Sequence, residues 1–162
     1  MSIVIGIDPG LRGGIAVLRD GEEPWVMPMP ALKYSPTRRI VDAGELARMF
    51  VRIVGTFAQA PNAHAFLEQV HAMPKQGVSS SFSFGRSLGV IEGVLATLGI
   101  PYTLVTPQRW QREMHQGCEG STPKLRSRIA HGRLFHSVIA DALIDAVLIA
   151  EFGRRQLRKG EV

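Results

Sequence analysis

The chain has 162 residues, 45% of them hydrophobic, and carries 19 Lys and Arg against 14 Asp and Glu, which gives a net charge of +5. This length suits one domain with a real core and excludes two large lobes, so we expect a single domain over residues 1–162. The basic balance favours a polyanionic partner. The one cysteine, Cys118, excludes an intramolecular disulfide. With no signal-peptide pattern and no apolar run of membrane-spanning length, we expect a cytoplasmic protein without membrane contact.

The start of the chain predicts a buried strand that ends in a carboxylate. Residues 3–8 are rich in β-branched side chains, and Asp8 closes the run. Two turn signals follow it, Pro9-Gly10 and Gly13-Gly14. A carboxylate in such a place is costly unless it is solvated, paired or bound to a metal. Asp8 therefore either begins a hairpin turn or belongs to a site that needs further carboxylates.

The rest of the chain predicts an α/β fold. Asp42 followed by Glu45 is a capping pattern that begins a helix. The strand–helix–strand succession over residues 64–106 implies parallel pairing through a right-handed crossover. The expected strands cover residues 3–8, 14–18, 23–27, 64–70 and 101–106. The expected later helices cover residues 82–98, a short turn from Pro107, 124–135 and 139–156, with loops at 31–41, 71–80 and 115–123.

Three further acids stand at unusual positions. Glu68 lies among apolar residues of a predicted central strand, although a strand edge with Glu68 facing water is an alternative. Asp141 and Asp145 are four residues apart in a helix that is apolar nearly all round, so both should project from one buried face. A bound cation would compensate this like-charge pair. Together with Asp8 the acids favour Mg2+ or Mn2+, and two such ions can clamp both oxygens of a phosphodiester under attack.

The predicted helix over residues 82–98 carries a row of glycines at four-residue spacing: Gly85, Gly89 and Gly93. Each costs about 1 kcal/mol of helix propensity against alanine. The row therefore predicts close approach of another backbone, from a helix of the same chain, a helix of a second subunit, or DNA. No Gly-Lys-Ser/Thr phosphate loop occurs in the sequence, which argues against a P-loop nucleotidase.

Taken together, several motifs resemble the RuvC-type Holliday junction resolvases, most closely the small phage and phage-like members. They are Gly-Ile-Asp-Pro-Gly at 6–10, Leu-Glu-Gln-Val at 67–70, and the segment 141–155, with 84–91 and 99–110 similar to the same group. The resemblance covers most of the chain in matching order. It implies an RNase H-like fold, with a five-stranded mixed sheet of three antiparallel strands followed by two parallel ones, flanked by helices. It also implies a homodimer that cuts two strands of a four-way DNA junction with Mg2+ and needs no small-molecule cofactor.

The resemblance carries the family's four catalytic, metal-binding acids over to Asp8, Glu68, Asp141 and Asp145. His71 stands where well-studied cellular members carry an aromatic residue that probes the junction centre, and a histidine can still stack there. Ala140 stands where many phage members carry a histidine before the third acid, and His136 is a nearby alternative ligand.

Basic and aromatic side chains supply the candidates for DNA contact, because Lys and Arg bind phosphate. Each basic candidate could equally be an ordinary surface residue, and for Phe82, Phe84 and Trp110 we expect core packing rather than stacking on bases. The basic and imidazole candidates are Arg12, His71, Lys75, Arg86, Arg109, Lys124, Arg126 and Arg128.

Three other functions stay open. A related nuclease could cut forks and flaps at the same site. A catalytically silent junction binder would need none of the four acids, which are all present. An actin-like ATPase or sugar kinase shares the Asp-x-Gly turn after its first strand, but it needs a second lobe for which this chain lacks the length.

Overall fold

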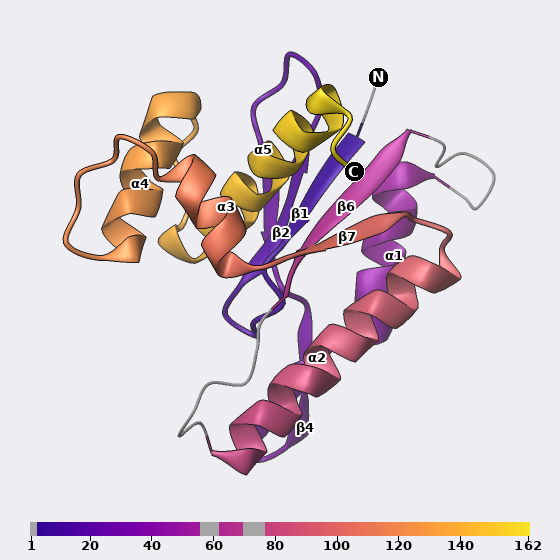
Figure 1. Cartoon of the computed structure of the whole chain (residues 1–162). Helices are drawn as coiled ribbons and strands as arrows, with labels where there is room; N and C mark the ends of the chain where they lie inside the picture. Colours follow the sequence, from indigo (N-terminus) through magenta and orange to yellow (C-terminus); the bar gives the residue numbers. More distant parts are fainter. Residues whose placement is uncertain (1–2, 56–61, 70–76) are drawn as a thin grey trace.

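A five-stranded mixed sheet forms the centre of the computed structural model, which describes residues 3–55, 62–69 and 77–162, with backbone only at 78–80. The strand order is β3-β2-β1-β6-β7. β2 pairs antiparallel with both β1 and β3, whereas β6 runs parallel to β1 and to β7. The expected sheet is therefore confirmed (Figure 1). Its strands are β1 (Ile3–Ile7), β2 (Gly14–Leu18), β3 (Trp25–Pro28), β6 (Ala63–Glu68) and β7 (Tyr102–Val105).

Helices cover both faces of the sheet. Ile5 and Ile7 of β1 pack into a core with the first two helices, while Val4 on the opposite face packs with the last three. This alternation is what a strand buried on both sides requires. One face thus carries α1 (Ala43–Val54) and α2 (Val78–Thr97), and the other carries α3 (Pro107–Met114), α4 (Pro123–Leu134) and α5 (Ile144–Lys159) (Figure 1).

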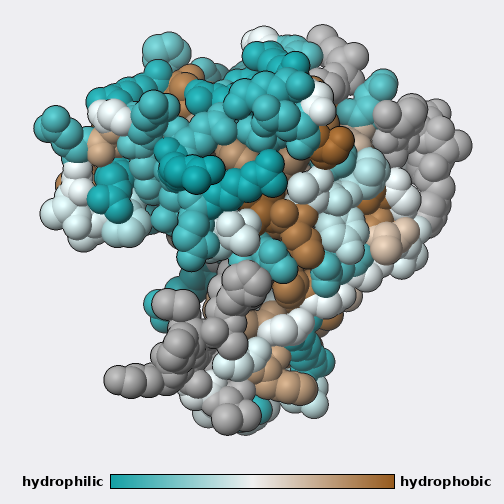
Figure 2. All heavy atoms as spheres, in the orientation of Figure 1, coloured by the Kyte–Doolittle hydropathy of each residue, from teal (hydrophilic) through white to brown (hydrophobic). Residues whose placement is uncertain are grey.

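A very close contact between sheet and helix lies at Gly6 in β1. A Cβ atom there would overlap the carbonyl oxygen of Ala146 and the backbone nitrogen of Ala150, both in α5. Only glycine lets the helix lie this close to the strand. Figure 2 shows hydrophilic residues gathered over α3, α4 and α5, with a hydrophobic band beside α2.

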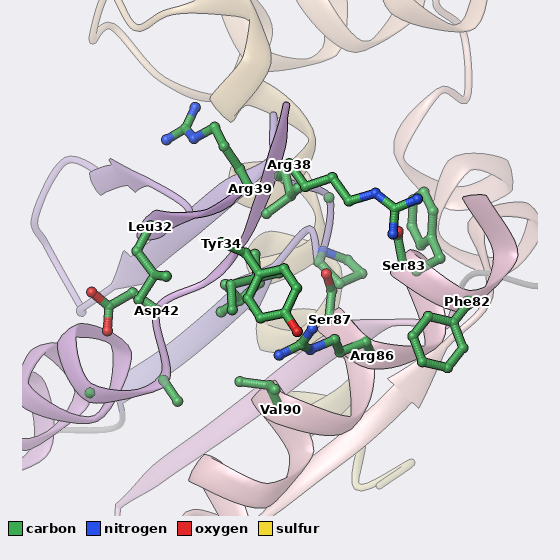
Figure 3. Close-up of a pocket in the computed structure, with 18 of the residues that line it drawn as sticks. Leu32, Tyr34, Arg38, Arg39, Asp42, Phe82, Ser83, Arg86, Ser87 and Val90 are labelled. Carbon is green, nitrogen blue, oxygen red and sulfur yellow. The ribbon is translucent and has the colours of Figure 1, made fainter. Parts of the chain in front are cut away.

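The loop expected over residues 31–41 is wrong, because the chain forms a second, two-stranded sheet there. β4 (Ala31–Ser35) and β5 (Arg38–Val41) pair antiparallel. The hairpin stands out from the main sheet toward the first half of α2, where Tyr34 lies beside Arg86 (Figure 3). The hairpin is short and its side chains are mostly exposed, so residues 31–41 carry only a weak strand signal.

The starts of two helices also differ from expectation by several residues. α2 begins at Val78 instead of residue 82, and α5 begins at Ile144 instead of 139. A 3-10 turn over Asp141–Leu143 precedes α5. Within the described ranges, no helix combines the length and hydrophobicity that crossing a membrane requires.

Candidate functional site

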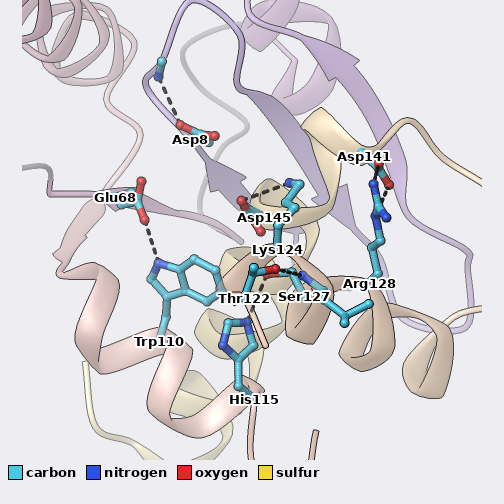
Figure 4. Close-up of polar contacts among 12 residues, drawn as sticks. Asp8, Glu68, Trp110, His115, Thr122, Lys124, Ser127, Arg128, Asp141 and Asp145 are labelled. Atoms are coloured by element: carbon cyan, nitrogen blue, oxygen red, sulfur yellow. Dashed lines mark hydrogen bonds and ion pairs between the residues drawn. The ribbon is translucent and has the colours of Figure 1, made fainter. Parts of the chain in front are cut away.

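Three of the predicted acids lie around one space at the edge of the main sheet (Figure 4). Asp8 directly follows β1, and Glu68 is the last residue of β6. Because these neighbouring strands are parallel, their carboxyl ends lie side by side. Asp145 stands in the first turn of α5, which packs on β1. The negative charges of Asp8 and Asp145 both raise the pKa of Glu68.

The glycine-rich turn after β1 fits closely around the Asp8 carboxylate. A Cβ atom on Gly13 would overlap that carboxylate, and the Gly10 N–H donates to Asp8 Oδ1 over 3.1 Å. The Asp8 N–H also donates to the Gly14 carbonyl, so Asp8 does begin a hairpin while facing the site. Burial raises the pKa of Asp8 above its ordinary value, and the charge of Asp145 adds to this, against the Gly10 hydrogen bond and Lys124.

Glu68 faces the site from inside the sheet, since β6 lies between β1 and β7. The alternative of an edge strand is therefore wrong. The indole Nε1 of Trp110 donates to Glu68 Oε1 over 2.8 Å. Burial raises the pKa of Glu68 to about 7, with the Asp8 and Asp145 charges adding to the effect and the Trp110 hydrogen bond opposing it. Glu68 is thus a carboxylate that binds a proton near neutral pH unless positive charge comes close.

Trp110 makes a contact with a site residue that the sequence analysis missed. The expected core packing is confirmed, because its side chain is only 1% exposed. Its hydrogen bond to Glu68 was not foreseen. The signal was present, since a buried indole N–H almost always needs an acceptor, and few acceptors stand in an apolar core.

α4 places two cations against the acids around the start of α5. Thr122 caps this helix by accepting the Leu125 N–H, and Lys124 and Arg128 stand four residues apart on it. Lys124 Nζ lies 3.2 Å from Asp145 Oδ2. Arg128 Nε donates to Asp141 Oδ1 over 2.8 Å, and a second guanidinium nitrogen contacts Oδ2. Lys124 and Arg128, two of the predicted DNA-contact residues, therefore bind carboxylates in this structure.

Asp141 does not join the other three acids. It lies in the 3-10 turn, its side chain is 49% exposed, and it points toward Arg128 (Figure 4). The hydrogen bond from Arg128 lowers the pKa of Asp141. The expected buried helix face shared with Asp145 is wrong, because Ala140 is extended and the α-helix begins only at Ile144.

The donors at this site suit a hard divalent cation. Asp145 Oδ1 is buried and has no hydrogen-bond partner among the described residues. Such an oxygen is costly without compensation, and carboxylate oxygens are the ligands that Mg2+ prefers. In the described part of the chain, no three acid, histidine or cysteine side chains come within reach of one common ion. The ligand type therefore suits such an ion, but the three carboxylates stand too far apart to share one. At least one of them must move for the ion to bind.

Among the described residues, none of the remaining candidates forms a hydrogen bond or ion pair with Asp8, Glu68 or Asp145. His136 donates its backbone N–H to Glu23 over 3.5 Å. Phe82 is 72% exposed, so the expected core packing is wrong for this residue. His71 and Lys75 lie outside the described residues. Arg12 is exposed on the turn after β1, Arg86 lies over Tyr34, Arg109 lies over Phe152, and Arg126 donates to the Gly120 carbonyl.

The whole chain shares its fold with solved structures of RuvC from Thermus thermophilus. One of these matches with a TM-score of 0.63 and 19% sequence identity over 98% of this chain and 97% of that one. Another, RuvC in complex with a Holliday junction substrate, matches with a TM-score of 0.64 and 19% identity over 99% of this chain and 98% of that one. No protein-family model and no curated protein matches the sequence. The likeness confirms the predicted RNase H-like α/β fold.

Proposed function

We propose that the chain is a divalent-metal-dependent endonuclease that resolves four-way DNA junctions in the cytoplasm by paired hydrolysis of phosphodiesters. The convergence of Asp8, Glu68 and Asp145 carries the proposal, because three buried or half-buried carboxylates face one another with too little positive charge between them. The shared fold supports it, since one of the matched RuvC structures holds a junction substrate.

The residues divide the chemistry among them. Asp8, Glu68 and Asp145 would hold Mg2+, or Mn2+ in its place, as one or two ions, and Asp141 would join them once Arg128 releases it. An ion held there would supply Lewis-acid chemistry: it would polarise the scissile phosphate and activate a water for attack on phosphorus, with the 3′-oxygen as the leaving group. Trp110 fixes the orientation of Glu68 by its 2.8 Å hydrogen bond. Lys124, which pairs with Asp145 over 3.2 Å, would be released to contact the phosphate where a bound ion neutralised that carboxylate.

A second copy of the chain would supply the second cut. The row Gly85, Gly89 and Gly93 faces open space, since a Cβ built on any of them has no atom of the described residues within 4 Å apart from its chain neighbours and the adjacent backbone of α2. A helix of the same chain is therefore excluded as the close neighbour within the described structure. We propose that this face of α2 packs on its counterpart in a homodimer, where small residues let two helices approach.

Light scattering tests the dimer. Gly89→Leu should lower the measured mass from dimer to monomer, while the melting temperature of the monomer stays the same because the position is open. Gly132→Leu is the matched control, since Gly132 is also helical with no neighbour within 4 Å. An unchanged mass for Gly89→Leu, or an equal loss for both variants, would remove this face as the dimer contact.

The function itself is tested by incubating the purified protein with labelled four-way junctions, forks, flaps and linear duplex, in Mg2+ and in EDTA. Paired symmetric nicks on the junction, lost in EDTA, are the expected result. Comparable cutting of forks and flaps would make the chain a broader debranching nuclease. Tight binding without cutting would leave a silent junction binder, and ATP turnover without nuclease activity would revive the actin-like alternative.

A further inference from the structure

A cavity of about 760 Å³ lies between the β4–β5 hairpin and the first half of α2 (Figure 3). Its wall continues to Pro9, Gly10 and Leu11, the residues that directly follow Asp8. The volume lies in the range that encloses small organic ligands. The carboxylate site and this cavity are therefore neighbours on the two sides of one turn, although no catalytic group lines the cavity.

The lining of the cavity is basic. Three arginine residues line it, Arg38, Arg39 and Arg86, against the single acidic residue Asp42. The Asp42 carboxylate already accepts the Glu45 N–H over 2.9 Å as a helix cap. Among the described residues, none of the three arginines forms an ion pair with an acid. Arg38 reaches across the opening toward α2, whereas Arg39 points away from the centre (Figure 3).

Aromatic rings stand exposed at the same place. The Tyr34 residue is 61% exposed and Phe82 is 72% exposed, which is unusual for side chains of this size. The Arg86 guanidinium carbon lies 4.9 Å from the centre of the Tyr34 ring. Exposed rings interleaved with arginines are how proteins bind single-stranded nucleic acid, with bases stacked on the rings and phosphates on the cations.

We propose that this cavity binds an unpaired nucleotide of a DNA strand that leads away from the carboxylate site, with its base on Tyr34 and its phosphate between Arg38 and Arg86. The proposal rests on the proposed function and adds to it a preference for DNA with unpaired bases. A base inside a duplex presents its faces to its neighbours in the stack and cannot lie on a protein ring. The cavity thus favours branch points, where pairing is interrupted.

The test measures binding of a short labelled oligothymidylate and of a duplex of the same length by fluorescence anisotropy, in EDTA. Tyr34→Ala should weaken binding of the oligothymidylate about tenfold and leave duplex binding nearly unchanged, because one stacked base is lost. Tyr34→Phe keeps the ring and should bind as the wild type does. Arg38→Gln should weaken oligothymidylate binding more than Arg158→Gln, a control that removes the same charge from the exposed end of α5.

Equal binding by Tyr34→Ala and wild type, or an equal loss on oligothymidylate and duplex, would overturn the proposal. The proposal would also be overturned if Tyr34→Ala changed the mass measured by light scattering but left DNA binding intact. The cavity would then be a contact between copies of the chain. If Tyr34→Ala lowers the melting temperature, the proposal is decided by whether Arg38→Gln weakens oligothymidylate binding more than Arg158→Gln does.

Wild-type cleavage of a four-way junction in Mg2+, run in parallel, keeps the two proposals separable. Junction cutting with binding that does not depend on Tyr34 refutes the cavity alone. Binding that depends on Tyr34 without junction cutting refutes the nuclease and leaves a single-strand binding site.

Discussion

The acids at the strand ends and the acids around the start of α5 are compensated in opposite ways. Asp8 and Glu68 receive hydrogen bonds from neutral donors, Gly10 and Trp110, and burial raises the pKa of both. Asp145 and Asp141 instead bind the cations of α4. Among the described residues, the acids at the strand ends thus have no cation as a hydrogen-bond partner, whereas Lys124 and Arg128 of α4 pair with the acids around the start of α5. A divalent cation would supply what the strand ends lack.

The largest expected effect is on cleavage. Asp8→Asn and Asp145→Asn should each slow junction cutting in Mg2+ by about a thousandfold, equivalent to about 4 kcal/mol of barrier, because each removes ligand charge with little change of shape. Junction binding, measured by gel shift in EDTA, should stay. Glu22→Gln, at an exposed turn, is the control. Full activity of Asp145→Asn would remove that carboxylate from the site.

Asp141 tests whether the two groups of acids act together. If Arg128 releases it to the metal, Asp141→Asn should lose about a hundredfold in cleavage rate. Arg128→Gln should then retain metal-dependent cutting. A loss below about threefold for Asp141→Asn would show that Asp141 serves only to hold α4, and that three carboxylates form the metal site.

The raised pKa of Glu68 predicts that the stability of the folded chain depends on pH. Its pKa is about 7 in the folded chain against 4.5 ordinarily, so the folded state keeps a proton that the unfolded state has lost. The free energy of unfolding without metal should therefore fall as pH rises from 4.5 to about 7, by at most about 3 kcal/mol. Glu68→Gln should reduce this slope in denaturant titrations. Equal slopes for variant and wild type would contradict the assignment.

The smallest effect is expected on metal affinity. Lys124 lies 3.2 Å from Asp145, so Lys124→Gln removes a cation that competes with Mg2+. Because the pair is partly exposed, the gain should be modest, about threefold in the dissociation constant measured by calorimetry without DNA. Arg126→Gln, on the same helix but bound to the Gly120 carbonyl, should change it less. Weaker binding by Lys124→Gln would mean that the lysine helps to shape the site.

The sheet and its two strand-end acids could be predicted, because residues 3–8 and 64–70 carry strong strand signals and parallel neighbours bring their ends together. The start of α5 could not, since Leu143 at its N-cap position makes no side-chain hydrogen bond and the sequence offers no capping signal there. The ion pairs from α4 depend on how two helices pack, which no local pattern encodes. The β4–β5 hairpin is short and mostly exposed, so the sequence alone could not separate it from a loop.

The contact at Gly6 has a consequence for ion selectivity. The separation between Asp8 and Asp145 depends on how closely α5 lies on β1, and that closeness is set by a residue with no side chain. An alanine at Gly6 would displace the helix and widen the carboxylate spacing without altering a single ligand. In a nuclease of the proposed kind, the choice between a small ion such as Mg2+ and a larger one could therefore shift through substitutions in the apolar core.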